Sequence, residues 1–236
     1  MSNEPAVHIP GGWELRRLNL GGREIEYWAP AEPDAFLEDA DTVAAHGPTA
    51  ESPGRSDIPF WQYVWPAAGH MARRVFAHDW EAEFPGTCAD LKALELGAGV
   101  GLVGLAALAA GLSVTFSDYQ APALEAAAVN ARRNGFSQFE TRLLDWNDPA
   151  GEQFPVILGC EVIYERAIHE PILDVLDFLL APGGVAWLGD PGRPRLPLFI
   201  EDARKRGFTV EIQNSQGEQQ AEARAGEFQL LILEAL

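Results

Sequence analysis

A glycine-rich turn between an expected strand and an expected helix is the feature that most restricts the fold of this chain. The segment from Leu94 to Gly104 reads LELGAGVGLVG; it overlaps the apolar run Lys92–Leu96 and runs into a helical stretch over Val103–Ala110. Glycine lets the backbone turn tightly and approach a ligand closely, because no side chain stands in the way. The amides of the helix N-terminus would then face that ligand.

An acidic residue after the next expected strand strengthens this interpretation. The strand Ser113–Ser117 is followed by Asp118, nineteen residues after Gly99. A carboxylate at that spacing can accept hydrogen bonds from both hydroxyls of a ribose. This order, in which a strand, a glycine turn, a helix, a second strand and an acidic residue follow one another, predicts a nucleoside-binding site. The pattern leaves the choice between a dinucleotide and S-adenosylmethionine open.

Short apolar runs alternate with helical stretches from Phe60 onward. This alternation implies crossover connections, a largely parallel sheet and helices on both of its faces. The last two runs are joined by the polar segment Asn214–Glu227, which has no room for a long helix, so the last strand should be antiparallel. The sequence thus predicts an α/β fold with seven strands: Lys92–Leu96, Ser113–Ser117, Phe139–Leu144, Val156–Cys160, Val185–Gly189, Phe208–Gln213 and Phe228–Leu233.

The first 59 residues form a separate unit in this interpretation. Polar and apolar residues partly alternate over Trp13–Leu20 and Arg23–Trp28, on both sides of a Gly-Gly pair, which predicts a β-hairpin. The segment Ala29–Pro59 is rich in Pro, Ala, Asp and Glu, and we expect a mobile linker there. The expected domains are a hairpin with its linker over 1–59 and a cofactor-binding domain over 60–236.

The charge of the chain restricts its partners. Lys and Arg number 17 and Asp and Glu number 35, a formal net charge of −18. Such a surface repels phosphate backbones, so nucleic acid is not an expected partner. A basic partner, such as a lysine-bearing protein, fits this charge. The alternative is that the acidity only keeps the chain in solution.

Targeting and metal signals are not recognisable in the sequence. Met1–Pro10 lacks the basic region and apolar run of a signal peptide, and the apolar stretch Leu102–Leu112 is too short to span a bilayer. Two cysteines, Cys88 and Cys160, do not make a disulfide scaffold, and the five histidines show no paired spacing for a metal. We therefore expect a cytoplasmic monomer without a metal or a membrane span.

Several motifs together resemble the seven-strand, class I S-adenosylmethionine-dependent methyltransferases. These motifs are Glu95 to Gly101, which reads ELGAGVG, Asp118, and Leu144-Asp-Trp146. The segment PFWQYVWPAA from Pro59 is similar to the N-terminal motif of the protein-lysine branch, methyltransferase family 16, which includes the methylase of the electron-transfer flavoprotein β subunit and its bacterial relatives. The resemblance implies a Rossmann-like fold and S-adenosyl-L-methionine as cofactor.

The resemblance also assigns the cofactor site. The residues that would line the methionine and ribose are Trp65, Glu95, Gly97, Gly99, Gly101 and Asp118. Asp145 would accept a hydrogen bond from the adenine amino group, Trp146 would pack on its ring, and Cys160 is assigned to the same site. The alternatives are a salt bridge at the strand end for Glu95 and a core aromatic for Trp146.

The candidate catalytic residues follow the fourth strand. The family carries Asp-x-x-Tyr there, and this sequence has Glu161-Val-Ile-Tyr164. Related protein methyltransferases with Glu-x-x-Tyr include histidine methylators, so the departure leaves the acceptor residue open. Glu161 and Tyr164 would attract an acceptor ammonium, orient it, or relay its proton to water. The alternative for Glu161 is a capped or paired carboxylate.

Three interpretations of the function stay open at this stage. The first is transfer of a methyl group to a lysine of a protein substrate. A small-molecule N-methyltransferase would use the same core. A non-catalytic cofactor-binding interaction module would keep the glycine turn but would not need Glu161 and Tyr164.

Overall fold

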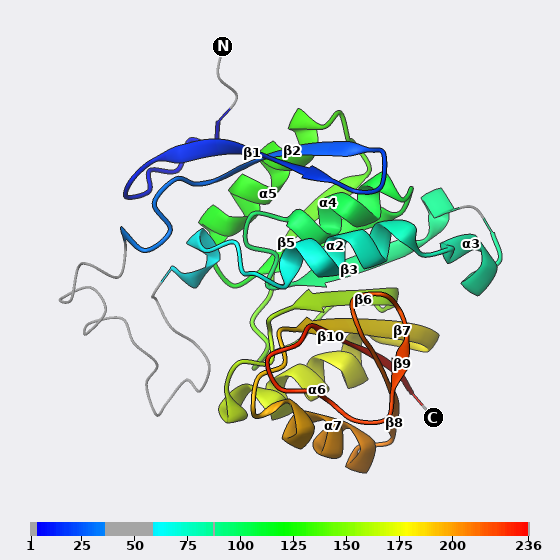
Figure 1. Ribbon diagram of the computed structural model, residues 1–236. Helices are drawn as coiled ribbons and strands as arrows, with labels where there is room; N and C mark the ends of the chain where they lie inside the picture. The colour runs from blue at the N-terminus through cyan, green and yellow to red at the C-terminus, as the bar shows by residue number, and fades with distance from the viewer. Residues whose placement is uncertain (1–3, 36–58, 87, 236) are drawn as a thin grey trace.

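The computed structural model describes residues 4–35, 59–86 and 88–235, and an eight-stranded sheet lies at its centre (Figure 1). The strand order is β5-β4-β3-β6-β7-β10-β8-β9. Neighbouring strands are parallel from β5 to β7, and β10 runs antiparallel to both β7 and β8. The strands are β3 (Lys92–Leu96), β4 (Ser113–Asp118), β5 (Phe139–Leu143), β6 (Phe154–Cys160), β7 (Leu180–Asp190), β8 (Phe208–Gln213), β9 (Gln219–Gln220) and β10 (Gln229–Ala235).

The seven predicted strands and the antiparallel last strand are confirmed; the two-residue β9 is an addition at the edge. Several strand ends differ from the predicted ones by one or two residues, and the start of β7 differs by five. The sequence Pro182-Gly183-Gly184 suggested a stop before a strand at Val185, yet β7 begins at Leu180, directly after the preceding helix. Pro182 and Gly183 are exposed, and the pairing with β6 shifts register between Phe154 and Val156, so the ladder accommodates them as an irregularity.

Helices cover both faces of the sheet, and each face has its own core (Figure 1). Successive side chains of a strand point to opposite faces. In β3, Ala93 accordingly packs with one core, whereas Leu94 and Leu96 pack with the other. The helices on the first face are α2 (Ala68–Ala77), α4 (Leu102–Ala109) and α5 (Ala121–Arg133), with the short α3 (Trp80–Glu83) beside them, and those on the second face are α6 (His169–Leu179) and α7 (Leu196–Lys205).

The glycine turn leads into a helix that is buried on every side. All eight residues of α4 are buried, because the sheet covers one side of it and α2 packs along it on the same face of the sheet. Helix α2 begins only at Ala68, after the proline of the segment before it. Pro66 disfavours helical backbone at Trp65, so the segment before α2 has only a 3-10 turn over Phe60–Gln62 and otherwise crosses the carboxyl ends of the strands in an irregular form. This segment carries aromatic residues to the site described below.

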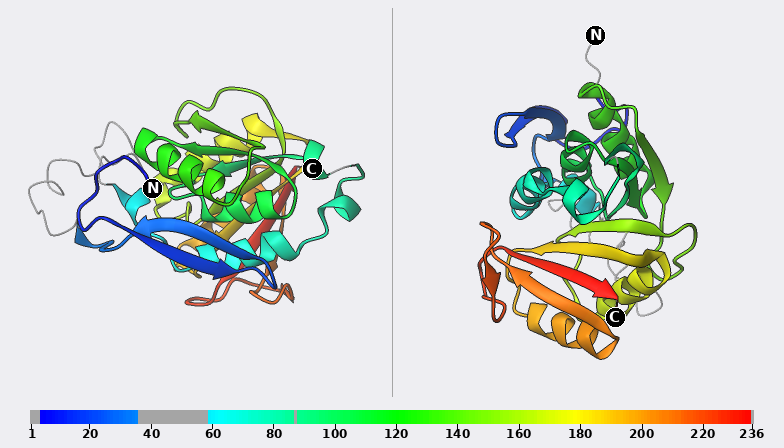
Figure 2. Two further views of the ribbon diagram at one scale, coloured as in Figure 1. Left: turned by 90° about the horizontal axis from the view of Figure 1, so that it is seen from above. Right: turned by 90° about the vertical axis from the view of Figure 1, so that its right-hand side faces the viewer.

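The predicted N-terminal hairpin is present, with β1 (Trp13–Asn19) antiparallel to β2 (Glu24–Pro30), and it lies on the outer side of α5 (Figure 2). Most of the expected linker lies outside the described residues. Hairpin side chains such as Ile25 and Ala29 enter the core shared with α4 and α5. The division of the chain at residue 59 stays a prediction.

Two asparagines, one in α5 and one directly after it, bind the free edge of β2 as another strand would. The Asn130 side chain accepts from the Trp28 amide at 2.7 Å and donates to the Trp28 carbonyl at 3.0 Å, and Asn134 pairs in the same way with Glu26. Asn130 is fully buried and also donates to the Val100 carbonyl, 2.9 Å away in the glycine turn. One side chain therefore connects the hairpin to that turn.

Replacing Asn130 by alanine should destabilise the protein strongly. The change removes three hydrogen bonds and leaves buried backbone groups of Trp28 and Val100 without partners, which should lower the free energy of unfolding by about 3 kcal/mol or more. Urea unfolding measures this loss. Asn134→Ala is the matched control, because its side chain is less buried and does not reach the glycine turn. Equal, small losses in the two variants would contradict this account of Asn130.

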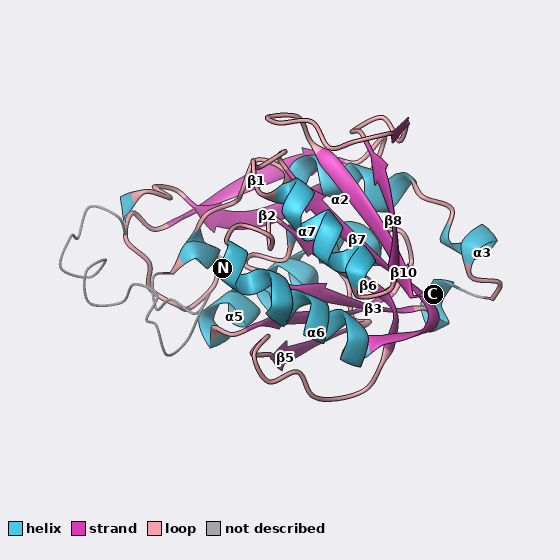
Figure 3. Cartoon of the chain, turned by 90° about the horizontal axis from the view of Figure 1, so that it is seen from below, coloured by secondary structure: helices cyan, strands magenta, loops and turns pink. Residues whose placement is uncertain are grey.

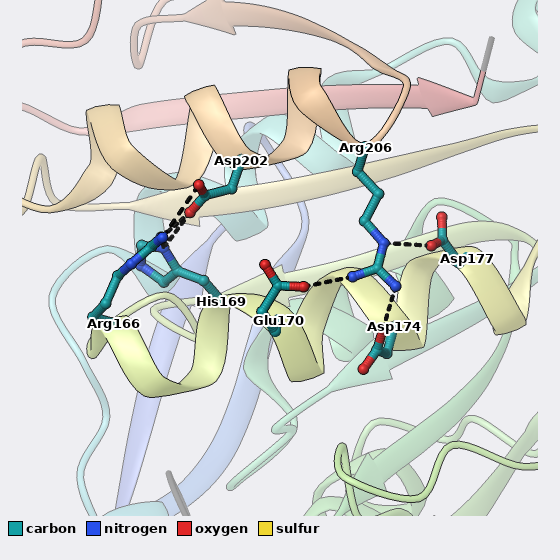
Figure 4. Close-up of polar contacts among 7 residues, drawn as sticks. All are labelled: Arg166, His169, Glu170, Asp174, Asp177, Asp202 and Arg206. Atoms are coloured by element: carbon teal, nitrogen blue, oxygen red, sulfur yellow. Dashed lines mark hydrogen bonds and ion pairs between the residues drawn. The ribbon is translucent and has the colours of Figure 1, made fainter.

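Polar contacts connect α6 to α7 on the second face, where the two helices lie side by side (Figure 3). Arg206, just after α7, donates to three carboxylates of α6: Glu170 at 2.8 Å, Asp177 at 2.6 Å, and Asp174 (Figure 4). The acidic face of α6 is thus partly neutralised within the chain.

Within the ranges that the structure describes, no helix has the length and apolar character needed to cross a membrane.

Candidate active site

A cavity of about 390 Å³ opens at the edge of the sheet where β3, β4 and β6 end. The chain runs from β3 to β4 and β5 on one side and from β6 to β7 on the other, so the strand order reverses at this point. Ligands of open α/β sheets bind outside the carboxyl ends of the strands at such a reversal, in pockets of a few hundred Å³. The cavity has the position and the size of a small-molecule site.

Most of the residues predicted from the sequence meet in this cavity. Nine of them line it: Trp65, Glu95, Gly97, Gly99, Asp118, Trp146, Cys160, Glu161 and Tyr164. The structure places Gly101 and Asp145 elsewhere. A Cβ atom on Gly101 would lie 2.9 Å from Cβ of Ala127, so Gly101 lets α4 pack on α5. The Asp145 carboxylate accepts from the backbone and side-chain amides of Asn147, each at 3.0 Å.

The glycine turn forms one wall through its backbone. Gly97 and Gly99 have φ angles of 59° and 53°, which residues other than glycine rarely adopt. A Cβ atom on Gly97 would lie 3.3 Å from the Trp146 ring, and one on Gly99 would lie 3.4 Å from the backbone oxygen of Trp61. The turn therefore lies directly against an aromatic ring on one side and against the segment before α2 on the other.

Asp118 closes the turn from the neighbouring strand. Its carboxylate accepts from the Gly99 amide at 3.1 Å and from the Gln120 amide at 3.0 Å, and the residue is only 4% exposed. Burial raises the pKa of Asp118 to about 6, although these amides favour the ionised form. A carboxylate has about four acceptor positions, and the chain does not use all of them, so Asp118 can still accept from the hydroxyls of a ligand.

Glu95 lies beneath the turn, at the start of α4. A Cβ atom on Gly104 would lie 2.5 Å from Oε2 of Glu95, and this oxygen has no hydrogen-bond partner among the described residues. Burial raises the pKa of Glu95 to about 8; the amides of Gly104 and Val103 act in the opposite direction through the positive end of the helix. The carboxyl group is therefore protonated at neutral pH until a cation approaches it.

The Glu95→Gln variant should remove a pH dependence of stability. Between about pH 4.5 and 8 the Glu95 carboxyl is ionised in the unfolded chain and protonated in the folded one, so the free energy of unfolding falls as the pH rises through this window. Urea unfolding of both proteins across this range should give the variant a growing advantage of at most about 1.4 kcal/mol for each pH unit. A constant difference between the two proteins would show that Glu95 is ionised in the folded state.

Glu161 has an unusual backbone, and each oxygen of its carboxylate accepts a hydrogen bond from the chain. It is the one residue other than glycine with positive φ in the described part of the chain, at 59°, and its amide donates to the Gly189 carbonyl at 2.7 Å. Oε1 accepts from the Ala67 amide at 2.7 Å, and Oε2 accepts from the Arg193 guanidinium at 2.5 Å. The side chain is 1% exposed. Glu161 thus joins the segment before α2 to the end of β6.

Tyr164 and Cys160 flank Glu161 in the cavity wall. Burial raises the pKa of the Tyr164 phenol well above its usual range, so the phenol keeps its proton at neutral pH. Burial, and then the neighbouring charge of Glu161, likewise raise the pKa of the Cys160 thiol. Both groups act as neutral hydrogen-bonding or packing groups in this environment and not as anionic bases.

Sequence reasoning missed Arg193, which follows β7. Its guanidinium donates to Glu161 and, at 2.9 Å, to Asp190, whose other oxygen accepts from the Arg193 amide at 2.7 Å. Asp190 also caps the turn between β7 and Arg193, because its Oδ1 accepts from the Gly192 amide. A charged residue at the carboxyl end of a central strand was the signal that could have drawn attention to it.

Aromatic residues from the segment before α2 complete the wall. Phe60, Tyr63 and Trp65 all line the cavity; the Tyr63 and Trp65 rings are 4.8 Å apart, and Trp65 is 36% exposed. Trp61 also reaches the cavity but is buried and packs near Trp13 in the core. The mouth is therefore aromatic, whereas the floor carries the carboxyl groups.

The order of these groups along the sheet edge fits an S-adenosyl compound. Trp146 follows β5 and offers a ring face for a base, Asp118 ends β4 and offers oxygens for a ribose, and the glycine turn follows β3. The partnerless Oε2 of Glu95 lies below that turn and would meet a cationic amino-acid end. Glu161 follows β6, at the far end. The residues present thus fit the cofactor from base to methyl group.

Comparison with known proteins agrees with this site. A family model described as lysine methyltransferase matches residues 59–189. The protein-lysine N-methyltransferase EEF2KMT of Mus musculus is 27% identical over 172 residues, 65% of this chain and 46% of that protein. The histone-arginine methyltransferase METTL23 of Rattus norvegicus is 30% identical over 130 residues, 52% of this chain and 55% of that protein. The chain spans about half the length of the curated relatives it matches.

Solved structures share the fold. A TehB-like SAM-dependent methyltransferase from Corynebacterium glutamicum aligns with a TM-score of 0.57 at 19% identity, over 88% of this chain and all of that chain. The glycopeptide N-methyltransferase MtfA, solved in complex with S-adenosyl-L-methionine, aligns with a TM-score of 0.54 at 15% identity, over 74% of this chain and 96% of that one. The Rossmann-like fold expected from the sequence is confirmed.

Proposed function

We propose that this chain, which belongs to the lysine methyltransferase family, transfers a methyl group from S-adenosylmethionine to the side-chain nitrogen of a lysine in a protein substrate. The family match confirms the resemblance to class I methyltransferases, and the cofactor of this class is S-adenosylmethionine. The observation that carries the proposal is the single cavity in which the glycine turn, Asp118 and Glu161 meet. In this proposal the methyltransferase domain covers residues 60–236.

The first task of the protein is to hold two reactants in line. S-adenosylmethionine, when bound, would supply an activated methyl group, whose carbon the acceptor nitrogen attacks as the sulfur leaves, so that no covalent enzyme intermediate is needed. Gly97 and Gly99 would let the cofactor lie against the backbone, Asp118 would hold its ribose, and Trp146 would cover its base. Holding the acceptor nitrogen close and collinear supplies much of the rate in such a transfer.

The second task is to present the acceptor as a neutral amine. An aromatic wall of Phe60, Tyr63 and Trp65 withdraws a lysine side chain from water, which lowers the pKa of its ammonium. The Tyr164 phenol keeps its proton and would orient the nitrogen by a hydrogen bond. Glu161 would stabilise the positive charge that develops on the nitrogen mainly through its field, since each of its oxygens already accepts a hydrogen bond from the chain.

A protein substrate is favoured over a small amine. Both curated relatives carry names that specify protein substrates, a protein lysine and a histone arginine. The net charge of −18 favours a basic partner and disfavours nucleic acid. The proposal includes a monomeric enzyme in the cytoplasm. A non-catalytic binding module would not need the buried Glu161 at the end of β6.

Label transfer from methyl-tritiated S-adenosylmethionine into a lysate of the source cell tests the proposal. The lysate is divided into macromolecules and small molecules. One half of the macromolecule fraction is acetylated beforehand, so that its lysine side chains are amides and cannot accept a methyl group. We expect one or a few labelled proteins that disappear in the acetylated half. Label in small molecules alone would favour the small-molecule N-methyltransferase. Cofactor binding without any transfer would favour the non-catalytic module.

A further inference from the structure

The acceptor end of the cavity already holds a guanidinium group that belongs to the chain. Arg193 donates from Nη2 to Oε2 of Glu161 at 2.5 Å and from Nη1 to Oδ2 of Asp190 at 2.9 Å. The carbon at the centre of the guanidinium lies 5.9 Å from the centroid of the Trp65 ring. Two carboxylates and an aromatic face are the surroundings that a guanidinium cation prefers.

The two carboxylates form a built and deeply buried pair. The Glu161 side chain is 1% exposed and that of Asp190 is not exposed, whereas the Arg193 side chain is 21% exposed at the cavity wall. Among the cavity-lining residues in the described ranges, Arg193 carries the one positive charge. Without this cation two buried negative charges would face each other, which is costly. The pair is therefore a cation site, and Arg193 fills it.

The location of this pair decides what it can discriminate. Glu161 follows β6 and Asp190 ends β7, so both lie beyond the glycine turn, on the side away from Asp118 and Trp146. An acceptor must approach from that side if the cofactor lies over β3, β4 and β5. An arginine substrate would need a free pair of carboxylates to hold its planar guanidinium group. A lysine amine needs only one hydrogen-bond acceptor and an apolar channel.

We propose that Arg193 determines acceptor specificity: it occupies the guanidinium site formed by Glu161 and Asp190, so that a substrate arginine cannot be held there and a lysine amine is accepted. This inference rests on the proposed function and names its acceptor. Arg193 is also a positioning residue for Glu161, because it holds Oε2 while the Ala67 amide holds Oε1. Removing Arg193 should therefore open a cavity that fits a free guanidinium ion.

Chemical rescue of the Arg193→Ala variant tests this proposal. The variant should methylate lysine roughly 100-fold more slowly than wild type and bind S-adenosylmethionine within about threefold of wild type, because it loses the positioning of Glu161 and not the cofactor site. Millimolar guanidinium chloride should raise the Tm of the variant and restore a large part of its activity, as a ligand that binds the folded state does. The same salt should do neither for wild type.

Three further variants make the test specific. Arg195→Ala removes an exposed arginine two residues away and should show neither loss nor rescue. Arg193→Ala combined with Glu161→Gln removes half of the carboxylate pair and should not be stabilised by guanidinium. Arg193→Lys keeps a cation and should fold, with reduced lysine transfer and no response to guanidinium, so it carries the test if Arg193→Ala does not fold.

The outcomes separate this inference from the proposed function. If wild type labels no protein, the proposed function fails and this inference fails with it. If wild type labels lysine but guanidinium neither stabilises nor rescues Arg193→Ala, only the inference fails. Equal methylation of arginine and lysine peptides by wild type would also overturn it. If Arg193→Lys is the only variant that folds, the inference fails when this variant transfers methyl to lysine at the wild-type rate. It also fails when guanidinium stabilises or activates this variant.

Discussion

Replacing Glu161 by glutamine should abolish methyl transfer while the cofactor still binds. The carboxylate accepts one hydrogen bond from the Ala67 amide and another from Arg193, and it is almost completely buried. An amide has an oxygen for only one of these donors and turns its own N–H groups toward the other. The variant also loses the negative charge that stabilises a developing cation. We expect the rate to fall by about 100-fold or more, the range of positioned polar groups in catalysis.

Two measurements on this variant separate catalysis from folding. Initial rates of label transfer give the loss of activity, and calorimetric titration with S-adenosylmethionine should give a dissociation constant close to that of wild type. Glu165→Gln is the matched control, since Glu165 lines the same cavity and is only partly buried. It should keep its rate within a few-fold. Turnover of Glu161→Gln at the wild-type rate would remove Glu161 from the mechanism.

Replacing Asp118 by alanine should have the largest effect on cofactor affinity. The change removes the acceptor proposed for the ribose hydroxyls and also releases the Gly99 amide, which the carboxylate holds at 3.1 Å. We expect affinity to fall about 100-fold, equivalent to roughly 2.7 kcal/mol. Because burial raises the pKa of Asp118 to about 6, the affinity of wild type should also weaken below that pH.

Calorimetry with Asp145→Ala provides the comparison for Asp118. The sequence assigned Asp145 to the adenine, whereas its carboxylate lies outside the cavity wall and accepts from Asn147. The structure therefore predicts a loss of less than about tenfold for this variant, as for a group without direct contact. Equal losses for the two variants would return Asp145 to the site. Unchanged affinity in Asp118→Ala would contradict the ribose assignment.

Local pattern was sufficient to predict the sheet and the turn at its centre. Apolar runs, glycines and one acid at the expected spacing identify β3, α4, β4 and Asp118, because all of these signals lie within about 25 consecutive residues of the chain. Gly101 was placed correctly in the turn, but its close approach to Ala127 concerns packing between two helices. Sequence spacing does not reveal which glycines meet a ligand and which meet a neighbouring helix.

The contacts that sequence reasoning missed join residues that are distant in the chain. Arg193 lies 32 residues after Glu161, and Asn130 lies 102 residues after Trp28. The same folding that joins β6 to β7, and the hairpin to α5, creates these pairs, and no periodicity encodes them. Glu161 was chosen for its position at the end of a strand, but the structure was needed to show that both of its oxygens are occupied.

Identifying the residue that receives the methyl group is the measurement that tests the central claim most directly. A protein labelled by the wild-type enzyme would be digested, and its modified peptide would be fragmented in a mass spectrometer to locate the added methyl groups. We predict that they lie on the side-chain nitrogen of a lysine. Methyl groups on arginine or histidine would contradict the assignment of the acceptor, and the absence of any modified protein would contradict the proposed function itself.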